Sequence, residues 1–283
     1  LVFTTKTPKK NQIFIGYRSF AKDVSPGENI LIDDGKIKLK VIDSNQKDQI
    51  TAKVVVSGVL SSFKGVNLPN TKISLPCLTL KDKKDLAFIL KEKIEWLALS
   101  FVRQSEDLIS LRKILKRNKS KIGVISKIEK PEAIKNIDEI ITYSNAIMVA
   151  RGDLGVEIPA HRVPAVQKNI VKKAVERSRP VIIATQMLES MTNNPVATRA
   201  EVNDVANSVI DGADAVMLSG ETSVGKYPVK TVDTMRKIIR DIEKSDYVFK
   251  PAVNQGLDTW LPKDRQISNS ICQHASQLSE QTR

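Results

Sequence analysis

The sequence has few aromatic residues, few cysteines and few histidines, and no apolar segment long enough to cross a membrane. Aromatic residues make up 5% of the chain and do not alternate with its basic stretches, which argues against the stacking surfaces of single-strand nucleic-acid binders. Cys77 and Cys272 lie far apart, without the spacing of a metal site, so a reducing cytoplasm is the expected location. His161 and His274 are isolated, and neither is expected to be catalytic. No secretory signal is visible, and we expect no membrane partner.

The chain is basic, with 45 Lys and Arg against 32 Asp and Glu among 283 residues, a net charge of +13. Acidic residues separate most of the lysines, and only the stretch 113–121 is densely basic, as at the end of a surface helix. We therefore expect no nucleic-acid partner. A basic, non-enzymatic binding protein remains an alternative, and a salt-dependent shift with DNA or RNA would support it. A positive field also suits an enzyme that handles anionic phosphates.

Residues 1–70 predict a small antiparallel β domain. Four segments are rich in β-forming residues and are separated by turn residues, at 12–17, 29–33, 36–42 and 49–56. The stretch 64–69 is interpreted as the linker that leaves this domain.

From residue 71 to about 250 the pattern becomes α/β, with short apolar runs that each end in a polar or charged residue. The runs lie at 96–99, 122–126, 146–150, 181–184 and 215–218. Helices are predicted at 79–93, 105–117, 131–141, 162–178, 198–210 and 228–243, with Thr79 and Ser105 as N-caps. This alternation indicates buried parallel strands in βα units. In closed parallel barrels the catalytic groups follow the strand ends, so the pattern predicts an enzyme with one polar site. The tail 251–283 is polar, with one predicted helix at 265–278.

A lysine and a carboxylate follow the second apolar run at alternate positions. Lys127 and Glu129 point the same way if this stretch is extended. A lysine beside a metal-binding carboxylate suits phosphoryl transfer, in which negative charge on the moving group must be neutralised. A solvated Lys–Glu pair on a loop is the alternative.

The run after the third strand, 148–157, contains Arg151-Gly152-Asp153 and a second glycine, Gly155. Glycines let backbone amides approach an anion, and Asp153 offers a hard oxygen ligand. Glu129 and Asp153, on neighbouring strands, are expected to share one Mg²⁺. The alternative is a tight turn whose glycines serve only a positive φ.

Two hydroxyl groups follow the last two strands. Thr185 and Ser219 are candidates for catalysis and equally for helix N-caps, and the sequence leaves both open.

Taken together, these segments resemble the pyruvate kinase family. The matching blocks run in family order across residues 25–245: 32–35, 64–69, 99–103, 125–129, 148–157, 184–191, 198–201 and 211–222. The resemblance implies a (β/α)₈ TIM barrel with a small all-β domain inserted after the third strand. Of this barrel the present chain would hold the last five βα units, giving domains at 1–70 and 71–250, with 251–283 as the start of a C-terminal domain.

The resemblance also implies an activity. The family transfers the phosphoryl group of phosphoenolpyruvate to ADP and yields pyruvate and ATP, with Mg²⁺ (or Mn²⁺) and usually K⁺. A homotetramer is the expected form of the full-length protein.

Site roles are implied by the same motifs. Lys127 would stabilise the transferring phosphoryl group and the enolate, and Glu129 with Asp153 would hold the metal. The Gly152 and Asp153 amides and the Thr185 hydroxyl would surround the substrate carboxylate.

Three further positions carry expected roles. Ser219 would belong to the proton-donating chain, and Ser100 would lie near the monovalent cation. Lys64 would reach the nucleotide phosphates. The alternative enzyme class is a metal-dependent aldolase or lyase that acts on pyruvate or phosphoenolpyruvate. Such an enzyme would also need the two carboxylates, but it would not need Lys64.

The family's first three barrel strands have no counterpart here, and neither do its substrate-binding arginine and most K⁺ ligands. We therefore expect these 283 residues, expressed alone, neither to close a barrel nor to catalyse efficiently.

Overall fold

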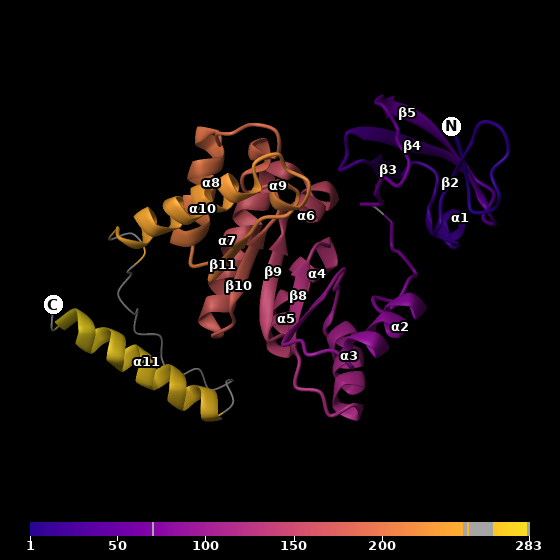
Figure 1. The fold of residues 1–283 in the computed structure, drawn as a ribbon. Helices are drawn as coiled ribbons and strands as arrows, with labels where there is room; N and C mark the ends of the chain where they lie inside the picture. Colours follow the sequence, from indigo (N-terminus) through magenta and orange to yellow (C-terminus); the bar gives the residue numbers. More distant parts are fainter. Residues whose placement is uncertain (70, 246–247, 249–262, 282–283) are drawn as a thin grey trace. The chain divides into compact units, whose positions relative to one another are not determined.

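The computed structural model describes residues 1–69, 71–245, 248 and 263–281 (Figure 1). Of the expected C-terminal segment, residues 251–262, 282 and 283 lie outside the described residues, as does residue 70 at the expected end of the first domain. The chain divides into two compact units. The first unit comprises residues 1–140 and 150–166, and the second comprises 141–149 and 167–283.

The first unit begins with a six-stranded sheet in the order β2-β1-β5-β4-β3-β6 (Figure 1). Its strands are β1 (Val2–Thr4), β2 (Gln12–Phe14), β3 (Asn29–Ile32), β4 (Ile37–Ser44), β5 (Gln49–Val56) and β6 (Val66–Asn67). Buried apolar residues alternate with more exposed ones along β3 and β4. These buried residues form one hydrophobic core together with the short helix α1 (Phe20–Asp23). Phe3 and Phe20 meet edge to face in that core, with ring centroids 6.0 Å apart.

Three details of this sheet differ from the sequence-based prediction. Strand β1 was not among the four predicted segments. The pair β1–β2 is parallel, whereas the pairs formed by β3, β4 and β5 are antiparallel as predicted. The stretch interpreted as a linker contains the edge strand β6, which pairs with β3. A strand of two residues is too short to show an alternating pattern, so the sequence could not reveal it.

The first unit also holds two parallel strands, β7 (Trp96–Leu99) and β8 (Gly123–Ile128). The helices that accompany them are α2 (Leu80–Ile89), α3 (Ser105–Arg117), α4 (Pro131–Lys135), α5 (Ile137–Tyr143) and α6 (Arg151–Glu157). The described 3₁₀ turn in this unit is η1 (Ala160–Arg162).

The predicted helix boundaries in this unit are partly right. Thr79 caps α2 through a reciprocal pair of hydrogen bonds with Asp82, but the helix ends four residues early, at Ile89. Ser105 was the wrong cap for α3. Gln104 occupies the N-cap position, while the Asp107 carboxylate accepts the backbone N–H groups before the helix.

In the second unit, β9 (Ala146–Ala150), β10 (Val181–Ala184) and β11 (Ala215–Met217) are neighbours in that order, and β10 and β11 are parallel. Every residue of β9 is buried, which explains its unbroken apolar run. The helices are α7 (Val163–Glu176, which begins in the first unit), α8 (Arg199–Ile210), α9 (Gly220–Ser223), α10 (Pro228–Glu243) and α11 (Lys263–Gln281), with the 3₁₀ turn η2 (Glu189–Thr192). Helices α8 and α10 lie against each other (Figure 1).

All five predicted βα strands are present, and the predicted α/β class is confirmed. One predicted helix is divided, because 131–141 forms α4 and α5 with Asn136 between them. In the part of the chain that the structure describes, no helix combines the length and the apolar character needed to cross a membrane.

Candidate active site

Strands β7 and β8 end beside each other and bring three polar side chains together. The Lys127 Nζ lies 2.6 Å from Glu129 Oε1 and donates a hydrogen bond of 3.2 Å to Ser100 Oγ. The Glu129 side chain is 1% exposed and that of Lys127 is 24% exposed. A charge pair with one member fully buried is not the solvated surface pair considered as an alternative. The alternate spacing of Lys127 and Glu129 therefore predicted a real contact.

The second oxygen of Glu129 is held by a residue that the sequence did not reveal. The Phe101 N–H donates to Glu129 Oε2 at 2.7 Å. Phe101 has φ of 55°, a left-handed conformation that is uncommon for a bulky residue. Such conformations persist where the surroundings fix them, often at functional sites. Here the conformation accompanies a backbone donor bound to the buried carboxylate.

Asp153 lies in the first turn of α6, which starts directly after β9. Burial raises the pKa of Asp153 above its usual value, and the nearby Glu129 carboxylate raises it further, while Lys127 lowers it in part. Two carboxylates that repel each other in a partly buried site are suited to a shared divalent cation. The donor set of hard oxygens fits Mg²⁺ or Mn²⁺ better than Zn²⁺.

The glycines of the same segment lie inside α6, a helix, so they do not supply a positive φ. The alternative of a simple tight turn at Gly152 and Gly155 is therefore wrong. Gly152 is the second residue of this helix, at the end where backbone N–H groups are not used by the helix itself. Among the described residues, no group of three or more His, Cys, Asp or Glu side chains is arranged to hold a metal. Two carboxylates would leave the other coordination positions to oxygens from elsewhere.

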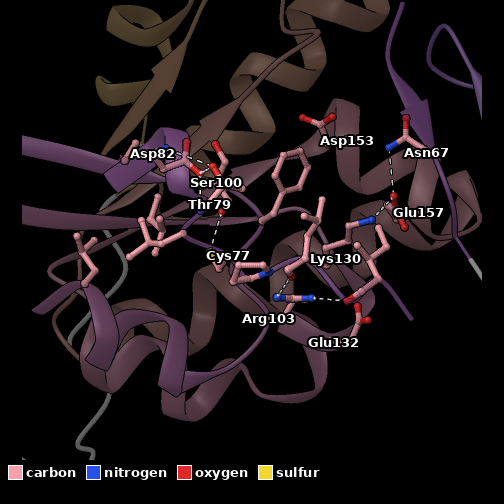
Figure 2. Close-up of a pocket in the computed structure, with 18 of the residues that line it drawn as sticks. Asn67, Cys77, Thr79, Asp82, Ser100, Arg103, Lys130, Glu132, Asp153 and Glu157 are labelled. Carbon is pink, nitrogen blue, oxygen red and sulfur yellow. Dashed lines mark hydrogen bonds and ion pairs between the residues drawn. The ribbon is translucent and has the colours of Figure 1, made fainter. Parts of the chain in front are cut away.

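A cavity of about 700 Å³ adjoins these groups (Figure 2). Its wall is formed by the segment 65–79, by parts of α2 and β7, and by the side chains that follow the strand ends. Ser100 and Asp153 belong to this wall, whereas Lys127 and Glu129 are not among its lining residues. Lys130 and Glu157, which the sequence analysis did not single out, also line it. The cavity wall is therefore mixed, with Leu86, Ile89 and two aspartates on the α2 side and charged side chains next to Asp153.

Lys64 is held within the small sheet by an acidic turn. Its Nζ lies 2.8 Å from Asp33 Oδ1, and this contact raises the pKa of Lys64. The next residue, Asp34, is close enough to Asp153 to contribute to the raised pKa of that carboxyl group. The turn that binds Lys64 thus faces the helix that carries Asp153.

The second unit brings together the loops that contain Thr185 and Ser219. The fully buried Glu221 carboxylate accepts the Leu188 N–H at 3.2 Å and the Ser219 N–H at 2.8 Å. Leu188 follows β10 and Ser219 follows β11, so one carboxylate joins both strand ends. No local pattern in the sequence predicts this role of Glu221.

Neither hydroxyl serves as a helix cap through its side chain. Ser219 occupies the N-cap position of α9 but makes no side-chain capping bond. Thr185 lies before η2, has φ of 71°, and its Oγ1 donates to the Ala184 carbonyl oxygen at 2.6 Å. Ser219 is therefore at the predicted cap position but without a side-chain capping bond, whereas the N-cap of η2 is Leu188 and not Thr185.

Comparison with known proteins gives the same family. A sequence model for the family described as "Pyruvate kinase, barrel domain" matches residues 2–232. A pyruvate kinase from Clostridium acetobutylicum is 50% identical over 230 residues, which is 81% of this chain and 48% of the relative. Pyruvate kinases from Staphylococcus aureus (strain MRSA252) and Staphylococcus epidermidis are 48% and 47% identical over 243 residues, which is 85% of this chain and 41% of each relative.

The chain thus spans less than half the length of these curated relatives. The family match nevertheless covers most of it, from the first strand of the small sheet into α10. By its sequence, this chain belongs to the pyruvate kinase family.

Proposed function

We propose that the full-length protein transfers the phosphoryl group of phosphoenolpyruvate to ADP and releases pyruvate and ATP. The observation that carries this proposal is the Lys127–Glu129 pair, a partly exposed ammonium 2.6 Å from a buried carboxylate. A positive charge beside the carboxylate that we assign to the metal supports this reaction, because phosphoryl transfer needs cations that neutralise the moving group. The names of the relatives support this reaction over the aldolase or lyase alternative.

In this proposal Glu129 and Asp153 bind Mg²⁺ or Mn²⁺, and K⁺ is a second cofactor near Ser100. The divalent ion would supply positive charge that neutralises phosphate oxygens. Glu129 is already oriented for this by the Phe101 N–H. The raised pKa of Asp153, caused first by burial and then by Glu129, means that a cation stabilises its ionised form.

Other residues of the chain would bind the substrate and stabilise the charges that develop during the reaction. Lys127 moves from Glu129 and Ser100 towards the transferring phosphoryl group and stabilises the enolate that forms. The Gly152 and Asp153 amides and the Thr185 hydroxyl bind the substrate carboxylate. Ser219 belongs to the path that delivers a proton to the enolate carbon.

Lys64 is assigned to the nucleotide. Its pairing with Asp33 is partly exposed, so exchange of this partner for a phosphate oxygen costs little. We also propose a homotetramer in the cytoplasm as the working form of the full-length protein.

A coupled assay tests the reaction. The full-length protein is mixed with phosphoenolpyruvate, ADP, Mg²⁺ and K⁺, and pyruvate and ATP are measured separately. We expect equal amounts of both products and no pyruvate when ADP is left out. Pyruvate and inorganic phosphate released without ADP would mean that water accepts the phosphoryl group, and would contradict the proposal. Pyruvate and ATP formed at the parent rate by Glu129→Gln would contradict the assigned site.

A further inference from the structure

A second buried ion pair lies beside the proposed metal carboxylates and has no role in the reaction described above. The Lys130 Nζ donates to Glu157 Oε1 at 2.6 Å, and the side chains are 11% and 2% exposed (Figure 2). Burying two charges costs solvation energy that their attraction repays only with good geometry, so a buried pair is weak evidence for stability. Its position at the cavity wall favours another role.

The chain positions of the two residues suggest which role. Lys130 is the residue directly after Glu129. Glu157 follows Asp153 by four residues in α6, which places both on the same side of that helix, one turn apart. The ion pair therefore joins the segment that carries one proposed metal ligand to the helix that carries the other.

Phe101 connects the same pair to a third segment. Its ring lies under the Lys130 ammonium, with 6.0 Å between Nζ and the ring centroid, a cation–π contact. The backbone N–H of Phe101 is also the donor that holds Glu129 Oε2. Lys130 is thus in contact with the residue that orients Glu129 and with the helix that positions Asp153.

Glu157 has one more partner. The Asn67 Nδ2 donates to Glu157 Oε1 at 3.1 Å (Figure 2). The same oxygen therefore receives two donors, one from Lys130 and one from the edge strand β6. A side chain fixed by two donors has little rotational freedom, so the end of α6 is held in place.

We infer that Lys130 and Glu157 are positioning residues that hold Glu129 and Asp153 at the separation needed to bind one divalent ion. The inference rests on the proposed function, because it takes these two carboxylates as the metal ligands. Neither Lys130 nor Glu157 touches the reacting atoms in this scheme. Groups that orient metal ligands in this way typically change metal affinity about 10- to 100-fold when they are replaced.

The test measures Mn²⁺ binding in the absence of substrate. The electron paramagnetic resonance signal of free Mn²⁺ reports how much of the ion remains unbound. The double variant Lys130→Met/Glu157→Gln removes both charges and so leaves no unpaired buried ion. We expect its Mn²⁺ dissociation constant to rise about 10- to 100-fold, with the thermal unfolding midpoint close to that of the parent. If the double variant does not fold, the Mn²⁺ dissociation constant is measured on Glu157→Gln alone, which keeps the shape of the side chain.

The matched control is Lys237→Met/Asp233→Asn, which removes the 2.7 Å ion pair on the exposed surface of α10. It should leave Mn²⁺ binding unchanged. A folded Lys130→Met/Glu157→Gln protein with the parent's Mn²⁺ affinity would overturn the inference and leave the pair a purely structural contact. Failure of the proposed function is read separately, from the absence of ATP formation by the parent. A parent that binds no Mn²⁺ would overturn the metal assignment and this inference together.

Discussion

Replacing Lys127 with methionine should change metal binding and catalysis in opposite directions. In the structure the Lys127 ammonium lies 2.6 Å from an oxygen of Glu129, so the lysine pairs with the carboxylate that we assign to the metal. A metal bound to the same oxygen would lie within a few ångströms of a positive charge. Removing that charge should therefore favour the metal.

The magnitude follows from the distances. Two unit charges about 4 Å apart interact by about 4 kcal/mol at the effective dielectric constant typical near a protein surface. The Lys127 side chain is 24% exposed and can turn towards solvent, which lowers this value. We expect Mn²⁺ to bind Lys127→Met at least tenfold more tightly, or about 1.4 kcal/mol.

Catalysis should fall in the same variant. The Lys127 charge is used as the phosphoryl group moves, and loss of one preorganised group at that stage costs about 10²–10³ in kcat. The fold should survive, because the Phe101 N–H still binds Glu129 and the metal replaces the lost positive charge.

Three measurements on the full-length protein check this prediction. They are the thermal unfolding midpoint, the Mn²⁺ dissociation constant without substrate, and kcat for pyruvate formation from phosphoenolpyruvate and ADP. Lys6→Met is the matched control, because Lys6 forms an exposed ion pair with Asp48 on the small sheet. A variant with near-normal kcat would refute the catalytic role, and weaker Mn²⁺ binding would refute the competition for Glu129.

The joint replacement Glu129→Gln/Asp153→Asn should remove one Mn²⁺ site per chain, and an unchanged number of sites in an equilibrium titration would mean that both acids are structural. Glu201→Gln should lower the unfolding free energy at pH 7 by about 1–2 kcal/mol, because it removes charged hydrogen bonds to Ser190 and to the α8 cap. Burial alone would raise the pKa of Glu201, but these hydrogen bonds outweigh burial and hold the pKa below its usual 4.5. This contribution is present above pH 4.5 and is lost as the pH falls through the lowered pKa, so urea unfolding of parent and variant should converge at acid pH and diverge at neutral pH. Leu108→Ala, at a fully buried position of α3, should cost about 2–5 kcal/mol in urea unfolding, and a loss near zero would show that α3 does not close the core.

The strands and most helices were predictable because their signals are local. The strand β9 is an unbroken apolar run because every one of its residues is buried. The start of α8 was predictable from Thr198 with Glu201 three residues later, and the structure contains both hydrogen bonds of that capping box. In each case the residues that specify the element lie within one or two turns of one another.

The errors occur where a local signal is weak or shared. Asn136 divides one predicted helix in two, although the apolar pattern continues across it. Ser105 is by type a better N-cap residue than Gln104, so residue type alone predicted the wrong helix start. In the structure Ser105 is the first residue of the helix, and its hydroxyl donates to Glu139, 34 residues away, a contact that no local pattern shows.

The candidate site was predictable only in part, for the same reason. Lys127 and Glu129 meet because alternate residues of a strand share a face, which is a local rule. Lys130 and Glu157 are 27 residues apart, and Glu221 accepts a hydrogen bond from Leu188, 33 residues away. Such pairings depend on how successive strand ends line up, and a single sequence does not contain that alignment.

Two backbone conformations show most clearly what could not be predicted from the sequence. Phe101 and Thr185, which follow β7 and β10, both have positive φ, although aromatic and β-branched residues disfavour it. Local preference would predict glycine or asparagine at such positions, so no sequence rule places a left-handed turn there. At Phe101 the cost is offset by a hydrogen bond to the buried Glu129, which exists only once β7 and β8 have paired. The conformation that orients the proposed metal ligand is therefore a product of the tertiary fold.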